Sequence, residues 1–268
     1  MVETSTDTLG KRKYFSELVA SRLSLMKVAK EGGILGTVQD RQRGKDIWRN
    51  VAEHQLVQAS ACEVLGDFLG WDKERTSKLV DAALVHDWDK PFQSTGLRKI
   101  NGRVASGEIS DEDGGKVKYD FFEESEEHST DGMRRFGVNP EVIKIASADG
   151  HPALPRVMRI DSSLEERVFH YIGSITDQDK IVPLDERIKN LENNARYAMM
   201  NEYGRQVPWT AGKTLYETQR EVGHRIEGEI TGLLLERDTV SADIKDRLRA
   251  NPSDLPQVIK ETVLSKFS

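Results

Sequence analysis

The chain has 268 residues, of which 31% are charged and 37% hydrophobic, and its net charge is −6. That length can form one large domain or two small ones around a substantial core. No window approaches the ~18–20 consecutive apolar residues of a membrane span, and the acidic balance argues against a nucleic-acid duplex as partner. The single cysteine, Cys62, excludes an internal disulfide and predicts a cytoplasmic protein.

The N-terminal fifth of the chain predicts one helix and one loop. Residues 1–9 have no apolar pattern, whereas a helical pattern runs from Lys11 to the Gly32-Gly33 pair. Gly36 to Arg43 is typical of a loop. A second helix is predicted from about Asp46.

This second helix carries one apolar stripe with a histidine at its head. The residues that recur every three or four positions are His54, Val57, Ala61, Val64, Leu65 and Phe68. A lone histidine on such a stripe is usually a core residue. Here, however, the stripe faces the next helix, which Asp72 is expected to cap and which carries His86.

The stretch from Asp81 to Phe92 delivers two adjacent residues of the metal-ligand type, His86 and Asp87, followed by Lys90. His86 continues the buried face of its helix, and Pro91 is expected to end the element. An imidazole beside a carboxylate suits a divalent cation such as Mn, Fe, Co, Ni, Zn or Mg. The alternative interpretation is a histidine at a helix end beside a capping aspartate.

Two more histidines fall at predicted helix ends. Residues 93–124 are rich in Gly, Ser, Asp and Lys and predict a long excursion with at most a short hairpin. Such a loop is either functional, as a lid or specificity element, or mobile. A short helix is expected from Ser125 to Gly137, which places His128 at its start. The next helix is capped by Asn139-Pro140, and His151 follows its end.

The remainder of the chain predicts further helices. The capping-box pattern of Ser163 and Glu166 begins one that should run to about Lys180. Asp185 to Tyr203, Trp209 to Leu235 and two short helices within 239–268 follow. The fold class is therefore all-α, with any β-structure confined to 93–120. His170 and His224 are expected at the surface or behind the ligands.

The order His54, His86-Asp87, His128, His151 and then an acidic pair at Asp177 and Asp179 resembles the HD-domain superfamily, over roughly residues 45–200. The segment from Asp179 to Arg187 is also of a type seen in members of that family. The resemblance implies a helical bundle that holds one or two divalent metal ions and hydrolyses phosphate esters. It also implies that Lys90 lies near the substrate phosphate.

By the same resemblance, His54, His86 and Asp87 hold a first metal ion, and Asp87 is shared with a second ion held by His128 and His151. The family's last ligand, an aspartate, aligns with Gly173 in this chain. Asp177 lies one helical turn further along, so it could reach the site from a shifted position. The other interpretation of Asp177 is an exposed acid.

These features predict a metal-dependent phosphohydrolase acting on a small phosphate ester, such as a nucleotide, with Lys90 and Asp87 in catalysis. Two alternatives remain: a degenerate HD module that binds a nucleotide as a sensor or scaffold, and a di-iron oxygenase that uses the same ligands. The predicted domains are an N-terminal helical extension (1–44), the HD core (45–200) and a C-terminal helical extension packed on it (201–268). Neither a membrane nor a nucleic-acid duplex is expected as partner, and the oligomeric state stays open.

Overall fold

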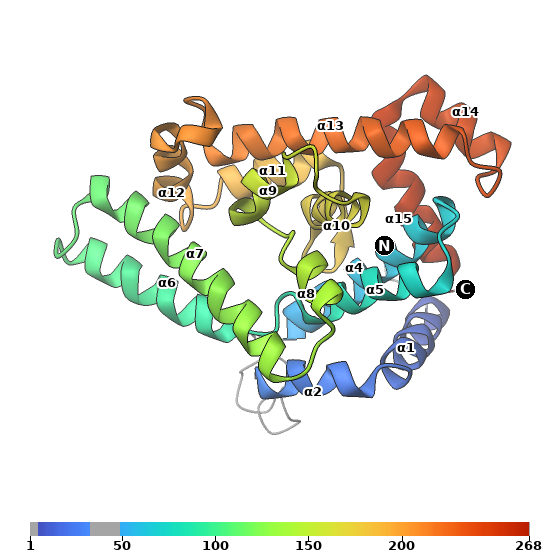
Figure 1. Ribbon diagram of the computed structural model, residues 1–268, viewed down its shortest axis with the longest axis horizontal. Helices are drawn as coiled ribbons and strands as arrows, with labels where there is room; N and C mark the ends of the chain where they lie inside the picture. Colours follow the sequence, from blue (N-terminus) through green and yellow to red (C-terminus); the bar gives the residue numbers. More distant parts are fainter. Residues whose placement is uncertain (1–4, 33–48, 268) are drawn as a thin grey trace.

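The computed structural model describes residues 5–32 and 49–267 and is helical apart from one short hairpin. The hairpin pairs β1 (Thr176–Asp177) with β2 (Lys180–Ile181) in antiparallel register. The helices are α1 Ser5–Ala20, α2 Leu23–Glu31, α4 Arg49–Phe68, α5 Lys73–Val85, α6 Lys90–Ala105, α7 Asp111–Arg135, α8 Pro140–Ala146, α9 Leu154–Val157, α10 Leu164–Ile175, α11 Leu184–Glu192, α12 Ala198–Tyr203, α13 Leu215–Leu235, α14 Ala242–Ala250 and α15 Leu255–Ser265 (Figure 1).

The all-α prediction is therefore confirmed for the described residues. The place of the hairpin was predicted wrongly, since it lies at 176–181 and not within 93–120. Among the helices that the structure describes, none is both long and apolar enough to cross a membrane.

The centre of the molecule is helix α10, which packs between two layers. On one side lie the paired helices α4 and α5 together with α8, and on the other lies the long helix α13 (Figure 1). Helix α10 is buried on most of its surface, including Val168, Phe169, Tyr171 and Ile172. Its charged residues are confined to the first turn, and the mostly apolar turns that follow belong in a core because each of their faces needs a partner.

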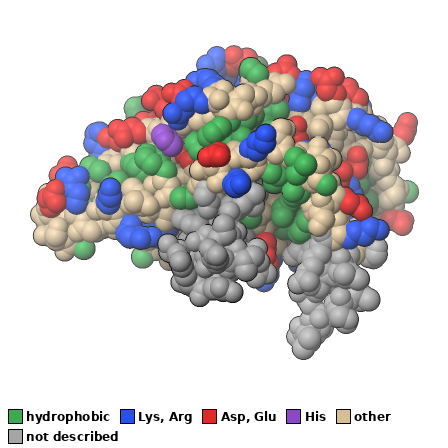
Figure 2. Space-filling view, turned by 90° about the horizontal axis from the view of Figure 1, so that it is seen from below, with side chains coloured by type: hydrophobic (Ala, Val, Ile, Leu, Met, Phe, Trp, Pro, Cys, Tyr) green, Lys and Arg blue, Asp and Glu red, His purple; other side chains and the backbone are tan. Residues whose placement is uncertain are grey.

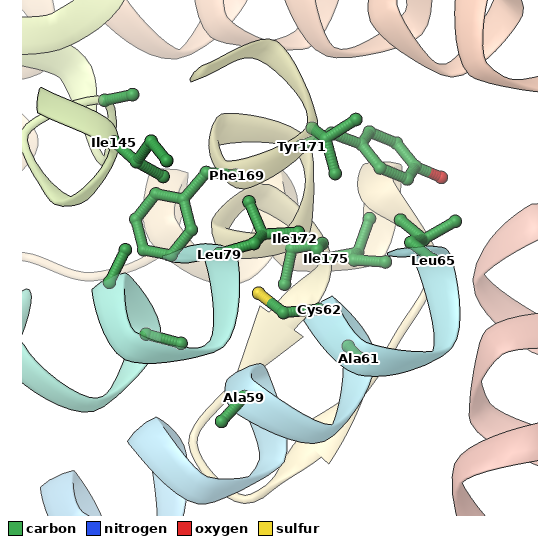
Figure 3. Close-up of a cluster of buried hydrophobic side chains, with 14 of the residues drawn as sticks. Ala59, Ala61, Cys62, Leu65, Leu79, Ile145, Phe169, Tyr171, Ile172 and Ile175 are labelled. Atoms are coloured by element: carbon green, nitrogen blue, oxygen red, sulfur yellow. The ribbon is translucent and has the colours of Figure 1, made fainter. Parts of the chain in front are cut away.

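The core connects the two helices that carry the predicted ligands. Figure 3 shows Ile145 of α8 and Leu79 of α5 near Phe169 of α10, and Leu65 of α4 near Ile175 of the same helix. Cys62 of α4 lies among the same side chains, and burial raises the pKa of its thiol. The cysteine is thus a small buried core residue.

Local sequence explains why α4 and α5 lie antiparallel and close. Gly70 has a φ of +67°, which a glycine adopts freely, and it turns the chain after α4. Asp72 then caps α5 by accepting a hydrogen bond from the backbone N–H of Arg75 at 2.7 Å. Gly66 of α4 faces Thr76 of α5, and a Cβ at Gly66 would lie only 2.6 Å from the Thr76 side chain.

The predicted excursion at 93–124 is wrong, because this stretch forms most of two long helices. Helices α6 and α7 pack against each other and extend to one side of the core, at the left of Figure 1. Only Leu97 and Ile100 of α6 are buried, so its sequence shows little apolar periodicity. The acidic run after Ser110 is the first turn of α7, where the positive end of the helix dipole stabilises carboxylates.

The expected short helix from Ser125 is accordingly the second half of α7, and His128 lies within this helix rather than at its start. Two other predicted helices are each divided in the structure. The predicted N-terminal helix is α1 and α2, and the predicted 185–203 helix is α11 and α12. The tail forms the two helices α14 and α15, as predicted.

The predicted loop from Gly36 to Arg43 and the predicted boundary at 44/45 lie outside the described residues. The predicted boundary at 200/201 falls inside α12. Helix α2 packs against α5, and α15 packs against α4. On the face shown in Figure 2, Lys and Arg side chains are interspersed with Asp and Glu side chains.

Candidate metal centre

Three predicted ligands, His54, His86 and Asp87, come together in the structure. One ligand atom of each residue lies within 4.8 Å of the others. Ligands held at about 2.0–2.2 Å from one ion in a tetrahedral site stand about 3.3–3.6 Å apart. The most distant atoms of the group therefore have to approach each other by up to about 1–1.5 Å to hold a cation.

Both imidazoles are fixed by hydrogen bonds that free the same ring nitrogen. Nδ1 of His54 donates to the carbonyl of Gln178 at 2.9 Å, and Nδ1 of His86 donates to the carbonyl of Ala83 at 2.9 Å. A carbonyl only accepts, so each Nδ1 carries the proton and each Nε2 keeps a lone pair. This is the arrangement that metal-binding histidines adopt.

The hairpin β1–β2 and the end of α5 supply those two carbonyls. Gln178 sits in the hairpin turn with a φ of +54°, which points its carbonyl toward α4. His86 is the first residue beyond α5, and residues 86–89 form the short link to α6. Pro91 was expected to end a helix; instead it lies in the first turn of α6, where the missing N–H costs nothing.

The Asp87 carboxylate is buried and remains charged. Its Oδ2 lies 3.6 Å from Nε2 of His86, and its Oδ1 accepts a hydrogen bond from Nζ of Lys90 at 2.9 Å. Burial raises the pKa of this carboxyl, but the positive charge of Lys90 and its hydrogen bond oppose burial, and the pKa is held well below its ordinary value. Asp87 thus offers an ionised oxygen at neutral pH.

Burial keeps the His54 ring neutral and leaves a ring nitrogen of His86 without a partner in the described part of the chain. Burial lowers the pKa of His54 to about 4, even though Asp87 opposes that shift. Nε2 of His86 is buried without a hydrogen-bond partner among the described residues. Leaving a buried ring nitrogen unpartnered is costly, and a bound cation would satisfy it. The residues present therefore fit a divalent metal ion.

A pocket of about 110 Å³ opens beside this group. Its walls include His86, Asp87, Lys90, Asp149 and His151. The Lys90 side chain is 39% exposed, so part of it is open to solvent while its ammonium group is paired with Asp87. Because Glu126 also lines the pocket, one ammonium group, three carboxylates and two imidazoles meet there.

His151 lines this pocket but lies outside the three-residue group. It is buried against the Phe122 ring at 4.8 Å, and its Nε2 has no hydrogen-bond partner in the described part of the chain. Burial lowers the pKa of His151 to about 3. The ring is therefore neutral and keeps its capacity to bind.

His128 lies apart from the pocket walls. Its ring stacks on Phe92 with centroids 4.2 Å apart and on Trp88 at 5.9 Å, and its Nδ1 lies 3.4 Å from Oδ2 of Asp89. Burial raises the pKa of the Asp89 carboxyl to about 6. The structure thus does not place His128 and His151 together in a second group of ligands among the residues it describes.

Asp177 also lies outside the group. Its two oxygens accept hydrogen bonds from Arg187 at 2.7 Å and from Asn190 at 2.8 Å. Asp177 ends β1 and joins the hairpin to α11, so its geometry is that of a structural ion pair.

Asp149, a residue that the sequence did not single out, lies beside Gly173, the position with which the last aspartate ligand of the HD family aligns. Its Oδ2 lies 3.9 Å from Nε2 of His86. A Cβ built on Gly173 would lie 2.0 Å from Oδ1 of Asp149, so the carboxylate fills the space beside that glycine. The available signal was the pairing of Asp149 with a turn glycine, Gly150, just before His151.

The two remaining histidines differ from each other. His170 was expected either at the surface or behind the ligands. The surface placement is wrong, because the ring is fully buried and its Nδ1 donates to the carbonyl of Ala148 at 2.8 Å. His224 is half-buried and pairs with Asp185 and Glu227, each at 3.1 Å.

Comparison of the chain with protein families, with curated proteins and with solved structures gave no match.

Proposed function

We propose that the chain is a metal-dependent phosphohydrolase of the HD type, with one divalent cation held by His54, His86 and Asp87. One observation carries this proposal. Two imidazoles are both locked by carbonyls on Nδ1, and both lie beside a buried, ionised carboxylate, with one ligand atom of each residue within 4.8 Å of the others. The resemblance of the sequence to the HD-domain superfamily supports the same assignment.

A divalent cation bound there supplies Lewis-acid activation of water and of a phosphoryl oxygen. The chain's own residues supply the rest. Asp87 holds the ligand group together by its contacts with His86 and Lys90. Lys90 binds the non-bridging oxygens of the phosphoryl group and offsets the negative charge that builds on them in the transition state.

The pocket limits the kind of substrate. At about 110 Å³ it is smaller than the ~300 Å³ of pockets that enclose a whole small ligand. It therefore suits the phosphoryl end of an ester, with the remainder of the molecule outside. A small phosphate ester, such as a nucleotide, meets this condition.

The test begins with elemental analysis of the purified protein. Assays with p-nitrophenyl phosphate and bis-p-nitrophenyl phosphate in Mn, Co, Ni and Mg then follow. We expect a bound transition metal and phosphate release, with both lost in His86→Ala and Asp87→Ala. His224→Ala is the matched control, because that ring pairs with Asp185 of α11 and with Glu227 of its own helix α13, and should leave both readouts unchanged.

The other outcomes separate the alternatives. Bound iron with oxygen consumption and no phosphate release would replace the proposal with an oxygenase. A bound ion with neither reaction would indicate a sensor or scaffold. A protein that binds no cation after reconstitution, or whose His86→Ala variant hydrolyses both esters as well as the wild type, contradicts the proposal.

A further inference from the structure

The turn that carries Asp149 is held from both sides by side chains of other segments. Arg156 donates to the carbonyl of Ser147, and His170 of α10 donates to the carbonyl of Ala148 at 2.8 Å. Gly150 then has a φ of +69°, a conformation in which a glycine carries no steric cost. The backbone of Asp149 is therefore fixed, and its carboxylate is aimed by the turn.

Helix α10 leaves a gap for that carboxylate. Gly173 lies three residues after His170, so the two positions share one face of the helix. A Cβ at Gly173 would stand 2.0 Å from Oδ1 and 3.1 Å from the carboxyl carbon of Asp149. No side chain larger than hydrogen fits there while Asp149 keeps its position.

The polar groups around this carboxylate are poorly satisfied. Oδ2 of Asp149 lies 3.9 Å from Nε2 of His86, which has no hydrogen-bond partner in the described ranges. The buried amide of Gln58 lies one turn after His54 on α4, and its Nε2 stands 3.4 Å from the point where a Cβ of Gly173 would be. Neither polar atom of that amide has a partner among the described residues.

Asp149 differs from the structural carboxylates of this chain in the distance to its partner. The carboxylates of Asp177 and Glu227, for example, each accept a side-chain hydrogen bond at 2.7 Å. Within the described residues, the closest basic neighbour of the Asp149 carboxylate is instead Nε2 of His86 at 3.9 Å, and that nitrogen has no hydrogen-bond partner there. A carboxylate beside an unpartnered imidazole nitrogen is a donor set that suits a divalent cation.

We propose that Asp149 is a fourth protein ligand of the cation site and that Gly173 is retained because its missing side chain makes room for the Asp149 carboxylate. This inference rests on the proposed function, since it requires the ion held by His54, His86 and Asp87. It adds an oxygen ligand from the end of α8 to donors from α4 and the end of α5. The site then has two imidazoles and two carboxylates.

Exchange of the two residues gives the sharpest test. EDTA-stripped wild type, Asp149→Asn, Asp149→Gly, Gly173→Asp and the double variant Asp149→Gly/Gly173→Asp are titrated with Mn²⁺ by calorimetry. The variant His86→Ala shows whether the measured Mn²⁺ binding takes place at the group of His54, His86 and Asp87. Gly232→Ala is the matched control, because Gly232 also lies near the end of a long helix and has no described atom within 4 Å of its Cβ position.

We expect Asp149→Asn and Asp149→Gly to raise the Kd for Mn²⁺ on the order of 100-fold. Gly173→Asp should weaken binding about 10-fold or more, because its Cβ displaces the carboxylate of Asp149. The double variant should regain affinity to within about 10-fold of the wild type, since the carboxylate returns from α10. Gly232→Ala should bind as the wild type does.

The isosteric Asp149→Asn variant keeps the test decisive even where a Gly173 variant does not fold, as judged by circular dichroism. If Asp149→Asn binds Mn²⁺ as tightly as the wild type while His86→Ala does not bind, the role of Asp149 is overturned and the proposed function stands. If the wild type itself shows no Mn²⁺ binding, both are overturned.

Discussion

The contact between Gly66 and Thr76 sets the spacing of the two helices that bring His54 to His86. A Cβ at Gly66 would stand 2.6 Å from both Cγ2 and Oγ1 of Thr76 and 3.0 Å from its Cβ, whereas ordinary contacts lie at 3.4–4 Å. Gly66→Ala therefore forces α4 and α5 apart by about 1 Å. Overpacking of this kind typically costs about 1–3 kcal/mol.

The substitution also brings a gain that has to be separated from the cost. Alanine in place of glycine favours a helix by about 1 kcal/mol. Gly232→Ala receives that gain without the contact, because Gly232 is exposed near the end of α13. We expect the free energy of unfolding of Gly66→Ala to lie about 1–3 kcal/mol below that of Gly232→Ala, measured by urea denaturation of the metal-free protein.

Removal of the opposing side chain should relieve the cost. Oγ1 of Thr76 is buried with no hydrogen-bond partner among the described residues, so Thr76→Ala alone should change stability little. In that background Gly66→Ala should lose at least about 1 kcal/mol less than in the wild type. Equal stability of Gly66→Ala and Gly232→Ala would refute the claim that this contact fixes the spacing of α4 and α5.

Three further predictions concern His151 and Lys90 in the pocket and Asp177 in the hairpin. Because burial holds the pKa of His151 at about 3, against about 6.5 in an unfolded chain, the unfolded state takes up a proton on acidification that the folded state refuses. The free energy of unfolding of the metal-free protein should then fall by about 2 kcal/mol for this group between about pH 7 and about pH 5. Urea denaturation at the two pH values should show a smaller loss of stability in His151→Gln. An equal loss in that variant would contradict the claim that His151 stays neutral in the folded protein. Lys90→Met should lower kcat about 100-fold while metal content measured by elemental analysis is unchanged, and loss of the metal would show that Lys90 instead holds the ligand group together. Asp177→Asn should leave the Mn²⁺ affinity unchanged, because its oxygens bind Arg187 and Asn190, whereas a weaker titration would restore Asp177 as a ligand.

The helical class and several helix starts could be predicted because they depend on local signals. The capping box of Ser163 and Glu166 and the cap at Asn139 are both present in the structure. The local pair His86-Asp87 marked the candidate metal centre for the same reason, since it follows a buried helical face directly.

The long helices α6 and α7 were missed because their glycines suggested a loop. Gly115 instead allows close packing, since a Cβ there would stand 2.7 Å from the carbonyl oxygen of Met199 in α12. A glycine that serves a contact between distant segments is indistinguishable in sequence from one that serves a turn. The packed partner has to be known first.

The same physical reason hid Asp149. Its relation to Gly173 is a contact between the turn after α8 and helix α10, so neither residue carries a local pattern that reports the other. Asp177 attracted attention because it shares a helical spacing with Gly173, but the chain leaves the helix at Ile175 and enters the hairpin. Helical spacing therefore does not apply beyond Ile175, and it wrongly placed the Asp177 carboxylate on the same side as Gly173.

The most direct test of the metal centre is anomalous diffraction from crystals of the full chain grown with MnCl₂. We predict a peak bounded by Nε2 of His54, Nε2 of His86 and the Asp87 carboxylate, at about 2.0–2.2 Å from each. A map with density only at surface carboxylates, and none between these three side chains, would contradict the account.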